Sequence, residues 1–277
     1  MPELPEVETI KIELEKIIKG KKIKNIDIKL PKIINVPPAQ FKKILIDSNI
    51  INIKRRAKIL IFELSNGYNL FIHLKLTGQF FYQSTINKQQ PTIKKGQVIF
   101  NFIDGSKLFY NDFRKFGWLK LMNNKEAEEF LEKENFGPEP LKQEFTLTVF
   151  KKILGKKKRS KIKPLLMDQK FIAGIGNIYA TEICFYAKIN PLRIISTLRE
   201  KEIDELYKGI KKILSTAIKL KGSSIDIYLD IYGQQGKYIS FLKVYDRAGE
   251  LCLKCKTKIE EITLAGRNTY FCPKCQN

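Results

Sequence analysis

Four cysteines near the C-terminal end constrain this chain more than any other feature. They are Cys252, Cys255, Cys272 and Cys275, two CxxC pairs separated by 16 residues. Each pair forms a tight turn with two sulfurs on one edge of a tetrahedron, and four thiolates leave no position for water. The spacing therefore predicts one structural Zn2+ and a β-hairpin between the pairs, with its tip near 265–267. A thioredoxin-like redox pair would need a βαβ setting that this stretch lacks.

The chain carries a strong positive charge. It has 51 lysines and arginines against 29 aspartates and glutamates, which gives a formal net charge of +22 over 277 residues. Such a balance indicates an anionic partner, with nucleic acid as the first candidate. Many lysines could simply be solvated, because the chain is rich in Lys, Ile and Asn throughout. The eight arginines are more informative, since their planar guanidinium groups bind phosphates in a bidentate manner.

The first residues, MPELPEVE, are not those of a secretion signal, which needs a basic start and an apolar run. No apolar stretch approaches the roughly 20 residues of a membrane-spanning helix. A cytoplasmic protein is therefore expected.

The first half of the chain is predicted to be rich in β-structure. After a helix at about 6–19, short runs of Ile, Phe and Tyr alternate with turn signals such as Asn66-Gly67 and Asp104-Gly105. This spacing is typical of a β-sandwich or flattened barrel. A short helix is expected at 125–133.

A break in the pattern divides the chain. Gly137, Pro138 and Pro140 interrupt it, and the residues beyond are helical in character. Thr197 and Glu200 match a capping box for a long amphipathic helix that Gly222 would end. We expect domains at 1–135 and 146–240, a linker at 136–145 and the zinc hairpin at 241–277.

Little conventional catalytic machinery is present. A single histidine, His73, rules out an HExxH site, and Walker A is absent. Removal of Met1 would leave Pro2 with a secondary amine, which can attack a sugar carbon and form an iminium. Glu3 beside it could transfer protons. From the residues alone, an ordinary processed N-terminus is the better interpretation, because most proteins that begin with Met-Pro are simply processed.

Several motifs in one order decide between these interpretations. They are MPELPEVE, RRAK at 55–58, DFRKFG at 112–117, GPEPL at 137–141, IKPLLMDQ, AGIGNIY at 173–179 and the cysteine hairpin. In combination they resemble the formamidopyrimidine-DNA glycosylase family over essentially the whole chain. The resemblance implies an α+β multidomain fold: an N-terminal β-sandwich with flanking helices, a C-terminal helix–two-turn–helix domain and a zinc-binding β-hairpin. It also implies a monomer that acts in the bacterial cytoplasm on double-stranded DNA containing an oxidised base.

The resemblance implies the following chemistry. Pro2 would attack C1′ of the damaged nucleotide, with Glu3 as acid and base and Glu6 orienting the terminus. Lys58 would donate a proton in β-elimination, and Arg267 would assist δ-elimination. The activity would be that of a bifunctional glycosylase and apurinic/apyrimidinic (AP) lyase that removes 8-oxoguanine and formamidopyrimidines.

The resemblance also implies a set of DNA contacts. Arg114 and Phe116 would fill the space left by the flipped base, with Leu76 where the family usually has methionine. The expected phosphate contacts are His73, Asn177, Arg159 and Lys163, with Tyr245 a weaker candidate. Lys95 would take a DNA-contact position where many relatives have histidines, and Asp246 stands where the family often has glycine. Ser223 and Ser224, in the loop 222–240, would offer backbone amides to the flipped purine.

Two alternatives remain open from the sequence. One is an endonuclease VIII-like glycosylase that prefers oxidised pyrimidines, although the opening MPELPEVE resembles the purine-specific branch. The other is a non-catalytic zinc-containing protein that only binds DNA, which would have no need of Pro2, Glu3 and Lys58 together. An RNA-binding ribbon protein does not explain the proline start.

Overall fold

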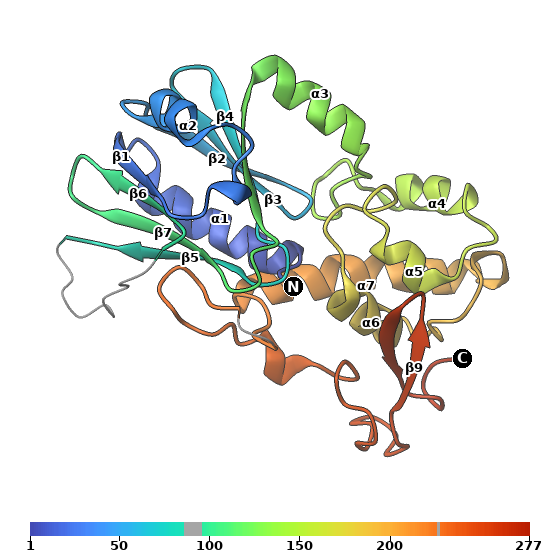
Figure 1. Ribbon diagram of the computed structural model, residues 1–277. Helices are drawn as coiled ribbons and strands as arrows, with labels where there is room; N and C mark the ends of the chain where they lie inside the picture. Colours follow the sequence, from blue (N-terminus) through green and yellow to red (C-terminus); the bar gives the residue numbers. More distant parts are fainter. Residues whose placement is uncertain (86–95, 226–227) are drawn as a thin grey trace. The chain divides into compact units, whose positions relative to one another are not determined.

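The structure is a computed structural model that describes residues 1–85, 96–225 and 228–277. Its contacts group the chain into two compact units. The N-terminal unit comprises Met1–Glu134 and Leu220–Lys237, and the C-terminal unit comprises Asn135–Lys219 and Tyr238–Asn277. Figure 1 shows the course of the chain through these elements.

Two four-stranded antiparallel sheets form the N-terminal unit (Figure 1). One has the order β1-β6-β7-β5 and the other β2-β3-β4-β8. The strands are β1 (Ile23–Ile28), β2 (Ile50–Arg56), β3 (Ile59–Leu64), β4 (Tyr68–His73), β5 (Gly78–Gln83), β6 (Val98–Phe102), β7 (Lys107–Asp112) and β8 (Trp118–Asn123). The predicted β-sandwich is thereby confirmed.

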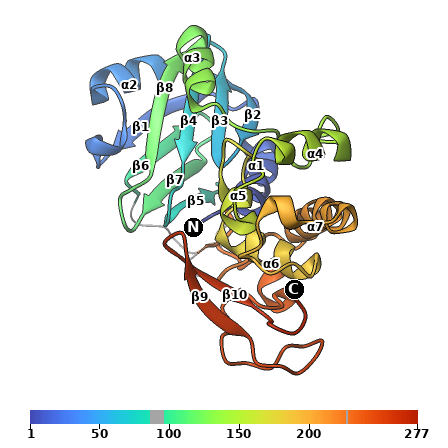
Figure 2. The ribbon, with the colours of Figure 1, turned by 90° about the vertical axis from the view of Figure 1, so that its right-hand side faces the viewer.

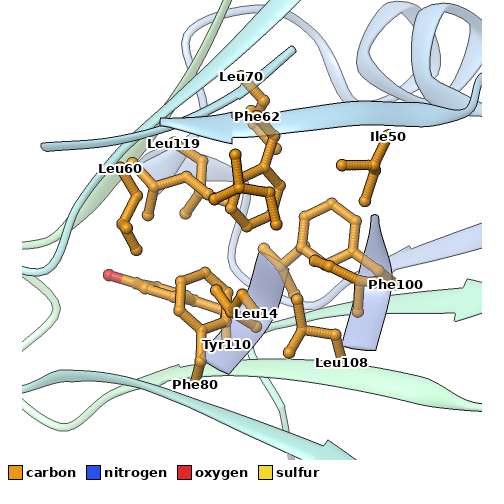
Figure 3. Packing of buried hydrophobic residues seen from close by; sticks show 14 of the residues in the cluster. Leu14, Ile50, Leu60, Phe62, Leu70, Phe80, Phe100, Leu108, Tyr110 and Leu119 are labelled. Atoms are coloured by element: carbon orange, nitrogen blue, oxygen red, sulfur yellow. The ribbon is translucent and has the colours of Figure 1, made fainter. Parts of the chain in front are cut away.

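The core lies between the two sheets. Phe62 of β3 and Phe80 of β5 belong to different sheets, and their ring centroids are 6.2 Å apart. Figure 3 shows Leu60, Phe62 and Leu119 facing Phe80 and Tyr110 in this core. Aromatic and branched side chains fit such a half-buried pleated surface, which explains the predicted strands.

Three helices flank the sandwich: α1 (Leu4–Ile18), α2 (Pro38–Leu45) and α3 (Asn124–Glu134). Helix α1 begins two residues before the predicted helix because Pro5 is well accommodated in a first turn. Its apolar side chains Val7, Ile10, Leu14 and Ile18 are fully buried in the core. Each such burial contributes about 1.5–3 kcal/mol, so the core holds the start of the chain firmly.

The C-terminal unit contains α4 (Leu147–Gly155), α5 (Ile162–Met167), α6 (Asn177–Tyr186) and α7 (Glu200–Lys219). The amphipathic pattern correctly predicts α7, whose buried residues include Leu206, Ile210 and Leu214. Short 3₁₀ helices lie at Pro31–Ile33, Ile195–Thr197 and Tyr238–Phe241. In the described part of the chain, no helix combines the length and apolar character needed to cross a membrane.

The predicted capping of α7 is wrong in its residues. The helix begins at Glu200, and the backbone N–H of Arg199 donates to Glu202 Oε2 at 2.7 Å. The Thr197 hydroxyl instead accepts a hydrogen bond from Arg193 Nε at 3.0 Å. A capping carboxylate is therefore present, but two residues later than the pattern suggested.

The cysteine module contains the predicted hairpin. Strands β9 (Glu260–Leu264) and β10 (Arg267–Phe271) pair antiparallel, and Figure 2 shows them side by side. Leu264 pairs with Arg267, so the turn consists of Ala265 and Gly266, both with positive φ. Two central residues of this conformation match a type I′ turn, whose twist suits a hairpin.

Residues 220–237 group with the N-terminal unit, whereas the sequence placed them in the helical domain. The Ser223 N–H donates to Glu6 Oε1 at 2.8 Å, and the Tyr82 N–H donates to the Ile231 carbonyl at 3.0 Å. Lys221 Nζ lies 2.8 Å from both Glu13 and Asp230. This segment is thus held by α1 and β5, although α7 of the C-terminal unit precedes it in the chain.

Candidate active site and nucleic-acid interface

Pro2 and Glu3 are buried at the start of α1, and Glu3 is only 2% exposed. The carboxylate of Glu6 joins this terminus to a distant segment. Its Oε2 accepts the Glu3 N–H at 2.9 Å, and its Oε1 accepts the Ser223 N–H at 2.8 Å. Glu6 therefore holds the backbone next to Pro2 and the beginning of the loop 222–240, as an orienting residue should.

Gly222 makes the approach to Glu6 possible. Its φ is +79°, and a Cβ atom here would lie 2.6 Å from Glu6 Oε1. Only glycine combines this backbone conformation with the lack of a side chain. Gly222 lies beyond the end of α7 at Lys219, so its main constraint is the contact with Glu6 rather than the predicted helix cap.

Lys58 lies in the tight turn between β2 and β3, where Ala57 has a φ of +52°. The lysine is only 6% exposed, so it is not a strand lysine pointing into solvent. Arg55 supports this turn: its Nη1 donates to the Ala57 carbonyl at 2.8 Å, and its Nε donates to Glu8 Oε2 of α1 at 2.6 Å. Neither Arg55 nor Glu8 is among the predicted site residues, although the RRAK motif contains Arg55 and the MPELPEVE motif contains Glu8.

His73 ends β4 as a half-buried residue. Burial, with smaller effects from the charges of Lys75 and Lys58, lowers its pKa to about 3. The Lys75 N–H donates to His73 Nδ1 at 2.9 Å, which leaves the imidazole proton on Nε2. His73 is thus a neutral hydrogen-bond donor at physiological pH rather than a cation.

Two turns of the sandwich lie side by side, one at 74–77 and one at 113–117. The Arg114 N–H donates to the Thr77 hydroxyl at 2.8 Å, and Thr77 also donates to Asp112. Leu76 is half-buried in the first turn rather than in a strand core. The structure therefore brings the segments of all three expected intercalating residues together.

The second turn presents exposed side chains. Arg114 is exposed and stacks over the ring of Phe116, with 5.1 Å between Cζ and the ring centroid. Phe113 is 86% exposed, more than any other large apolar residue among those described. Sequence analysis did not single out Phe113, although it belongs to the DFRKFG motif. An aromatic side chain left in water points to a contact surface.

The expected role of Lys163 as a phosphate contact is not supported. Its side chain is 1% exposed, and Nζ donates to Asn177 Oδ1 and Thr269 Oγ1, each at 2.6 Å. Asn177 Nδ2 donates in turn to the Asn268 carbonyl at 3.0 Å. Lys163 is therefore a buried residue that links the start of α6 to strand β10.

Asn177 is the first residue of α6, and Gly176 before it offers no side chain to cap the helix. A helix start of this kind attracts phosphate oxygens through its amides and its dipole. Arg159, before α5, and Arg267, at the start of β10, are both exposed. All three residues lie in the C-terminal unit. Arg159 and Arg267 are accessible for phosphate contacts, whereas Asn177 is half-buried and its side-chain amide is bonded to Lys163 and Asn268. Lys95 lies outside the described residues.

The loop after α7 differs in detail from the expected purine-binding loop. The Ser223 amide is already bonded to Glu6, so it is not available to a base. The Ser224 hydroxyl donates to the Tyr228 carbonyl at 2.7 Å and accepts the Gly236 N–H at 2.8 Å, which closes the loop on itself. The Ser223 hydroxyl is buried without a hydrogen-bond partner among the described residues.

The four cysteine sulfurs meet the geometry of a zinc site. They lie within 4.8 Å of one another, with Cys252 and Cys275 Sγ 4.0 Å apart and Cys255 and Cys272 Sγ 3.4 Å apart. Zn–S bonds of about 2.3 Å in a tetrahedron separate sulfurs by roughly 3.8 Å. The residues thus form a site for one structural zinc, as predicted.

Comparison with known families covers most of the chain. Residues 1–119 match the formamidopyrimidine-DNA glycosylase N-terminal domain, and residues 136–228 match the H2TH domain of the same enzyme. Residues 249–277 match the zinc finger found in FPG and IleRS.

Full-length relatives agree with these matches. The formamidopyrimidine-DNA glycosylase of Listeria monocytogenes is 41% identical over 100% of both chains, and that of Carboxydothermus hydrogenoformans is 42% identical over 100% of both. The Lactococcus lactis Fpg, solved with DNA containing an abasic site, is 39% identical, with a TM-score of 0.89 over 99% of each chain. A mutant of that protein bound to Fapy-dG DNA has a TM-score of 0.90 over 100% of each chain at 39% identity. The chain belongs to the formamidopyrimidine-DNA glycosylase family of DNA repair enzymes.

Proposed function

We propose that this protein is a bifunctional DNA glycosylase and AP lyase that removes oxidised purines from double-stranded DNA. The observation that carries the proposal is the arrangement around Pro2. Glu3 and Glu6 are buried beside it, and Glu6 fixes the Glu3 amide at 2.9 Å. A binding protein would gain nothing from burying two carboxyl groups at its N-terminus, whereas an amine nucleophile needs a fixed position and a proton partner.

The chemistry requires a free secondary amine, so Met1 must be removed. The Pro2 nitrogen attacks C1′, the bond from C1′ to the base breaks, and the departing base takes up a proton. Glu3 transfers protons as the sugar ring opens to an iminium. Loss of a C2′ proton then breaks the C3′–O bond, and a second elimination breaks the C5′–O bond. Water then hydrolyses the iminium, which releases the unsaturated sugar fragment as an aldehyde and restores the Pro2 amine. The DNA product is a one-nucleotide gap with phosphates at both ends.

Lys58 and Arg267 assist the two eliminations in this scheme. The burial of Lys58 in the turn after β2 suits a lysine that acts at a defined position rather than one that is solvated. Arg267 is exposed at the tip of the zinc hairpin, which a structural zinc keeps rigid. A rigid hairpin can hold an arginine against a phosphate without ordering a loop at each turnover.

DNA binding follows from the same surfaces. His73 donates from Nε2 to a phosphate while it stays neutral, Asn177 offers its helix terminus, and Arg159 adds charge. Arg114 and Phe116, with Leu76 beside them, replace the flipped nucleotide in the stack. Flipping a base costs a few kcal/mol, which such insertion offsets.

The preference for oxidised purines is supported by the family and by the opening MPELPEVE. The buried, unpartnered Ser223 hydroxyl is one polar group that the loop could offer to a base. We also propose that the protein acts as a monomer in the cytoplasm, where reducing conditions keep the four cysteines available for zinc.

Borohydride trapping tests this proposal. Wild-type protein with a duplex containing 8-oxoguanine opposite cytosine should give a covalent protein–DNA product. Pro2→Gly should weaken the product, and Glu3→Gln should abolish it. Glu15→Gln, near the C-terminal end of α1, serves as the matched control and should give as much trapped product as the wild type. A parallel duplex with thymine glycol tests the preference for pyrimidines.

Two results would contradict the proposal. Trapping by Pro2→Gly at the wild-type level would remove Pro2 as nucleophile. No trapped product from wild-type protein whose Met1 is absent by mass spectrometry would leave only a DNA-binding relative. A much higher yield of trapped product on thymine glycol than on 8-oxoguanine would show that the protein prefers oxidised pyrimidines.

A further inference from the structure

The C-terminal unit contains a cavity of about 460 Å³ that the proposed chemistry does not use. Its apolar wall comes from three segments: Phe185 and Tyr186 at the end of α6, Tyr238 and Phe241 after α7, and Leu253 between the first two cysteines. Phe241 is 46% exposed and Leu253 is 54% exposed. Exposed apolar groups around a cavity are characteristic of a site that receives an apolar side chain.

Four lysines also line this cavity: Lys188, Lys212, Lys243 and Lys254. All four are exposed, and none of them forms an ion pair with a carboxylate in the described chain. The one carboxylate that lines the cavity belongs to Glu182, which is 1% exposed. It accepts hydrogen bonds from the amides of residues 243–245 at 2.9–3.1 Å. Four lysines against one buried carboxylate give the rim a net positive charge.

The cavity is separate from the proposed phosphate contact on the same helix. Asn177 is the first residue of α6, whereas Phe185 and Tyr186 are the last two. Nine residues of helix span about 14 Å, so the two sites lie at opposite ends of α6. The dipole points its negative end toward the cavity, where it would not by itself attract phosphate.

We propose that this cavity, which we name the lysine-rimmed pocket, is a docking site for a short acidic peptide segment of a partner protein. An apolar side chain of the peptide enters between Phe241 and Leu253, and the neighbouring carboxylates pair with the four lysines. The positive charge of the lysines and the exposed apolar wall together define this partner. Single-stranded nucleic acid needs exposed ring faces for stacking, and Tyr238 in the wall is only 2% exposed.

Fluorescence anisotropy with a designed probe tests the pocket in the full-length, zinc-loaded protein. The probe is a labelled peptide of five aspartates followed by Phe-Leu-Phe. Two comparison peptides replace either the aspartates with lysines or the apolar residues with serines. The double variant Lys212→Glu, Lys254→Glu should weaken binding of the probe at least about tenfold, and Phe241→Ser should do so too. Lys219→Glu, Lys258→Glu is the matched control, because both residues are exposed outside the pocket.

Each outcome has a defined meaning. Weak binding of both comparison peptides, together with the loss in the two pocket variants only, supports the proposal. Equal weakening by the pocket and control double variants would overturn it in favour of general attraction of anions. Displacement of the probe from wild type by an unlabelled single-stranded 12-mer, together with weaker direct binding of a labelled 12-mer to Phe241→Ser than to wild type, would assign the pocket to nucleic acid instead. The assay needs no catalysis, so its result is independent of the function proposed above.

Discussion

Glu6 shows how one side chain can join segments more than 200 residues apart in sequence. Its carboxylate accepts hydrogen bonds from the Glu3 and Ser223 amides, and Gly222 leaves room for it. Hydrogen bonds to a charged, buried acceptor are among the stronger ones in proteins. The geometry of the proposed nucleophile therefore depends on a residue that need not touch the substrate.

A Glu6→Gln substitution is expected to separate positioning from chemistry. Glutamine retains one acceptor oxygen, so one of the two amides loses its partner, at a cost of about 1–3 kcal/mol. We expect a lower urea midpoint and a reduced yield of trapped product, with wild-type affinity for undamaged duplex. Glu15→Gln is the control. An unchanged urea midpoint would show that the two hydrogen bonds do not stabilise the folded protein.

His73 should contribute to the pH dependence of stability. Its folded-state pKa of about 3 lies below the ordinary value of 6.5, because the residue is buried near Lys75 and Lys58. The unfolded chain thus binds the proton more tightly. The stability gained is complete above about pH 6.5 and is lost as the pH falls toward 3.

The corresponding prediction compares wild type with His73→Gln. Between pH 6.5 and 5 the wild type should lose about 1.7 kcal/mol more than the variant, because the slope reaches 1.36 kcal/mol per pH unit only below the unfolded-state pKa of 6.5. Urea unfolding at the two pH values measures this difference. Parallel losses in both proteins would show that His73 does not titrate in this way.

Some residues differ from the expectation for physical reasons that a sequence does not display. Lys163 is buried because Asn177 and Thr269 take up its hydrogen bonds, and those partners become visible only in three dimensions. Asp246 has a φ of +58°. Glycine adopts this left-handed conformation at no steric cost, and aspartate is among the residues that tolerate it best.

At the scale of elements, the start of α7 illustrates the limit of pattern reading. Thr197 and Glu200 have the spacing of a capping box, yet Arg199 and Glu202 occupy those roles. The 3₁₀ helix at Ile195–Thr197 uses the Thr197 hydroxyl locally, where it donates to the Ile194 carbonyl at 2.8 Å. The residue pairs Thr197/Glu200 and Arg199/Glu202 could each cap α7. The Thr197 hydroxyl is engaged by Arg193 and Ile194, and the second pair forms the cap.

Glu202→Ala should therefore destabilise the C-terminal unit more than Glu200→Ala. Burial opposes ionisation of Glu202, but hydrogen bonds from Arg199 and the charges of Arg193 and Arg199 outweigh it and lower the pKa. Loss of such a cap costs about 0.5–2 kcal/mol. The difference in stability between the two variants should be present above the usual glutamate pKa of 4.5. It should shrink as the pH falls below that value and Glu202 becomes protonated. Thermal unfolding at pH 7 and pH 3.5 measures it, and equal losses in the two variants would refute the assignment.

The sequence predicts that the first half of the chain forms strands, but it does not predict every strand. The runs of Ile, Phe and Tyr at 23–30, 51–64, 68–76, 96–103 and 106–113 predict β1, β2 with β3, β4, β6 and β7, but they do not include β5 and β8. The aromatic stretch GQFFYQ at 78–83 and the alternating WLKLMN at 118–123 carry ordinary strand signals.

At the scale of the whole molecule, zinc should stabilise only part of the protein. The cysteine module has a small core of five buried residues: Val244, Cys252, Ile259, Tyr270 and Cys272. So small a core depends on its metal, because binding free energy is folding free energy in such modules. The sandwich core contains no zinc ligand.

Chelation or Cys275→Ser should consequently raise amide exchange in β9 and β10 and leave β4 protected. Duplex affinity should fall by at least about tenfold, because the hairpin no longer presents Arg267 in a fixed position. Hydrogen exchange followed by mass spectrometry gives the first result, and a filter-binding titration gives the second. Cys184→Ser is the matched cysteine control for zinc content, since it lies outside the metal cluster. Retained protection of the hairpin without zinc would contradict the prediction.

The division of the molecule into units was the hardest property to predict. Charge, the cysteine spacing and the motif order indicate the fold and the family. The return of residues 220–237 to the N-terminal unit depends on Glu6, Glu13 and Tyr82, none of which is near them in sequence. Local patterns describe elements, whereas the partners of a loop are set by tertiary contacts.

The grouping of residues 220–237 with the N-terminal unit has a consequence for synthesis on the ribosome. The sandwich strands are complete once residue 123 has emerged, but the segment that binds Glu6 and Glu13 follows about a hundred residues later, roughly 5–20 s at the usual rate. Until then Glu6 lacks the Ser223 amide and Glu13 lacks the ammonium group of Lys221. The nascent chain therefore acquires its proposed catalytic terminus only after most of the helical unit has been made, so no released fragment shorter than about 237 residues can be active.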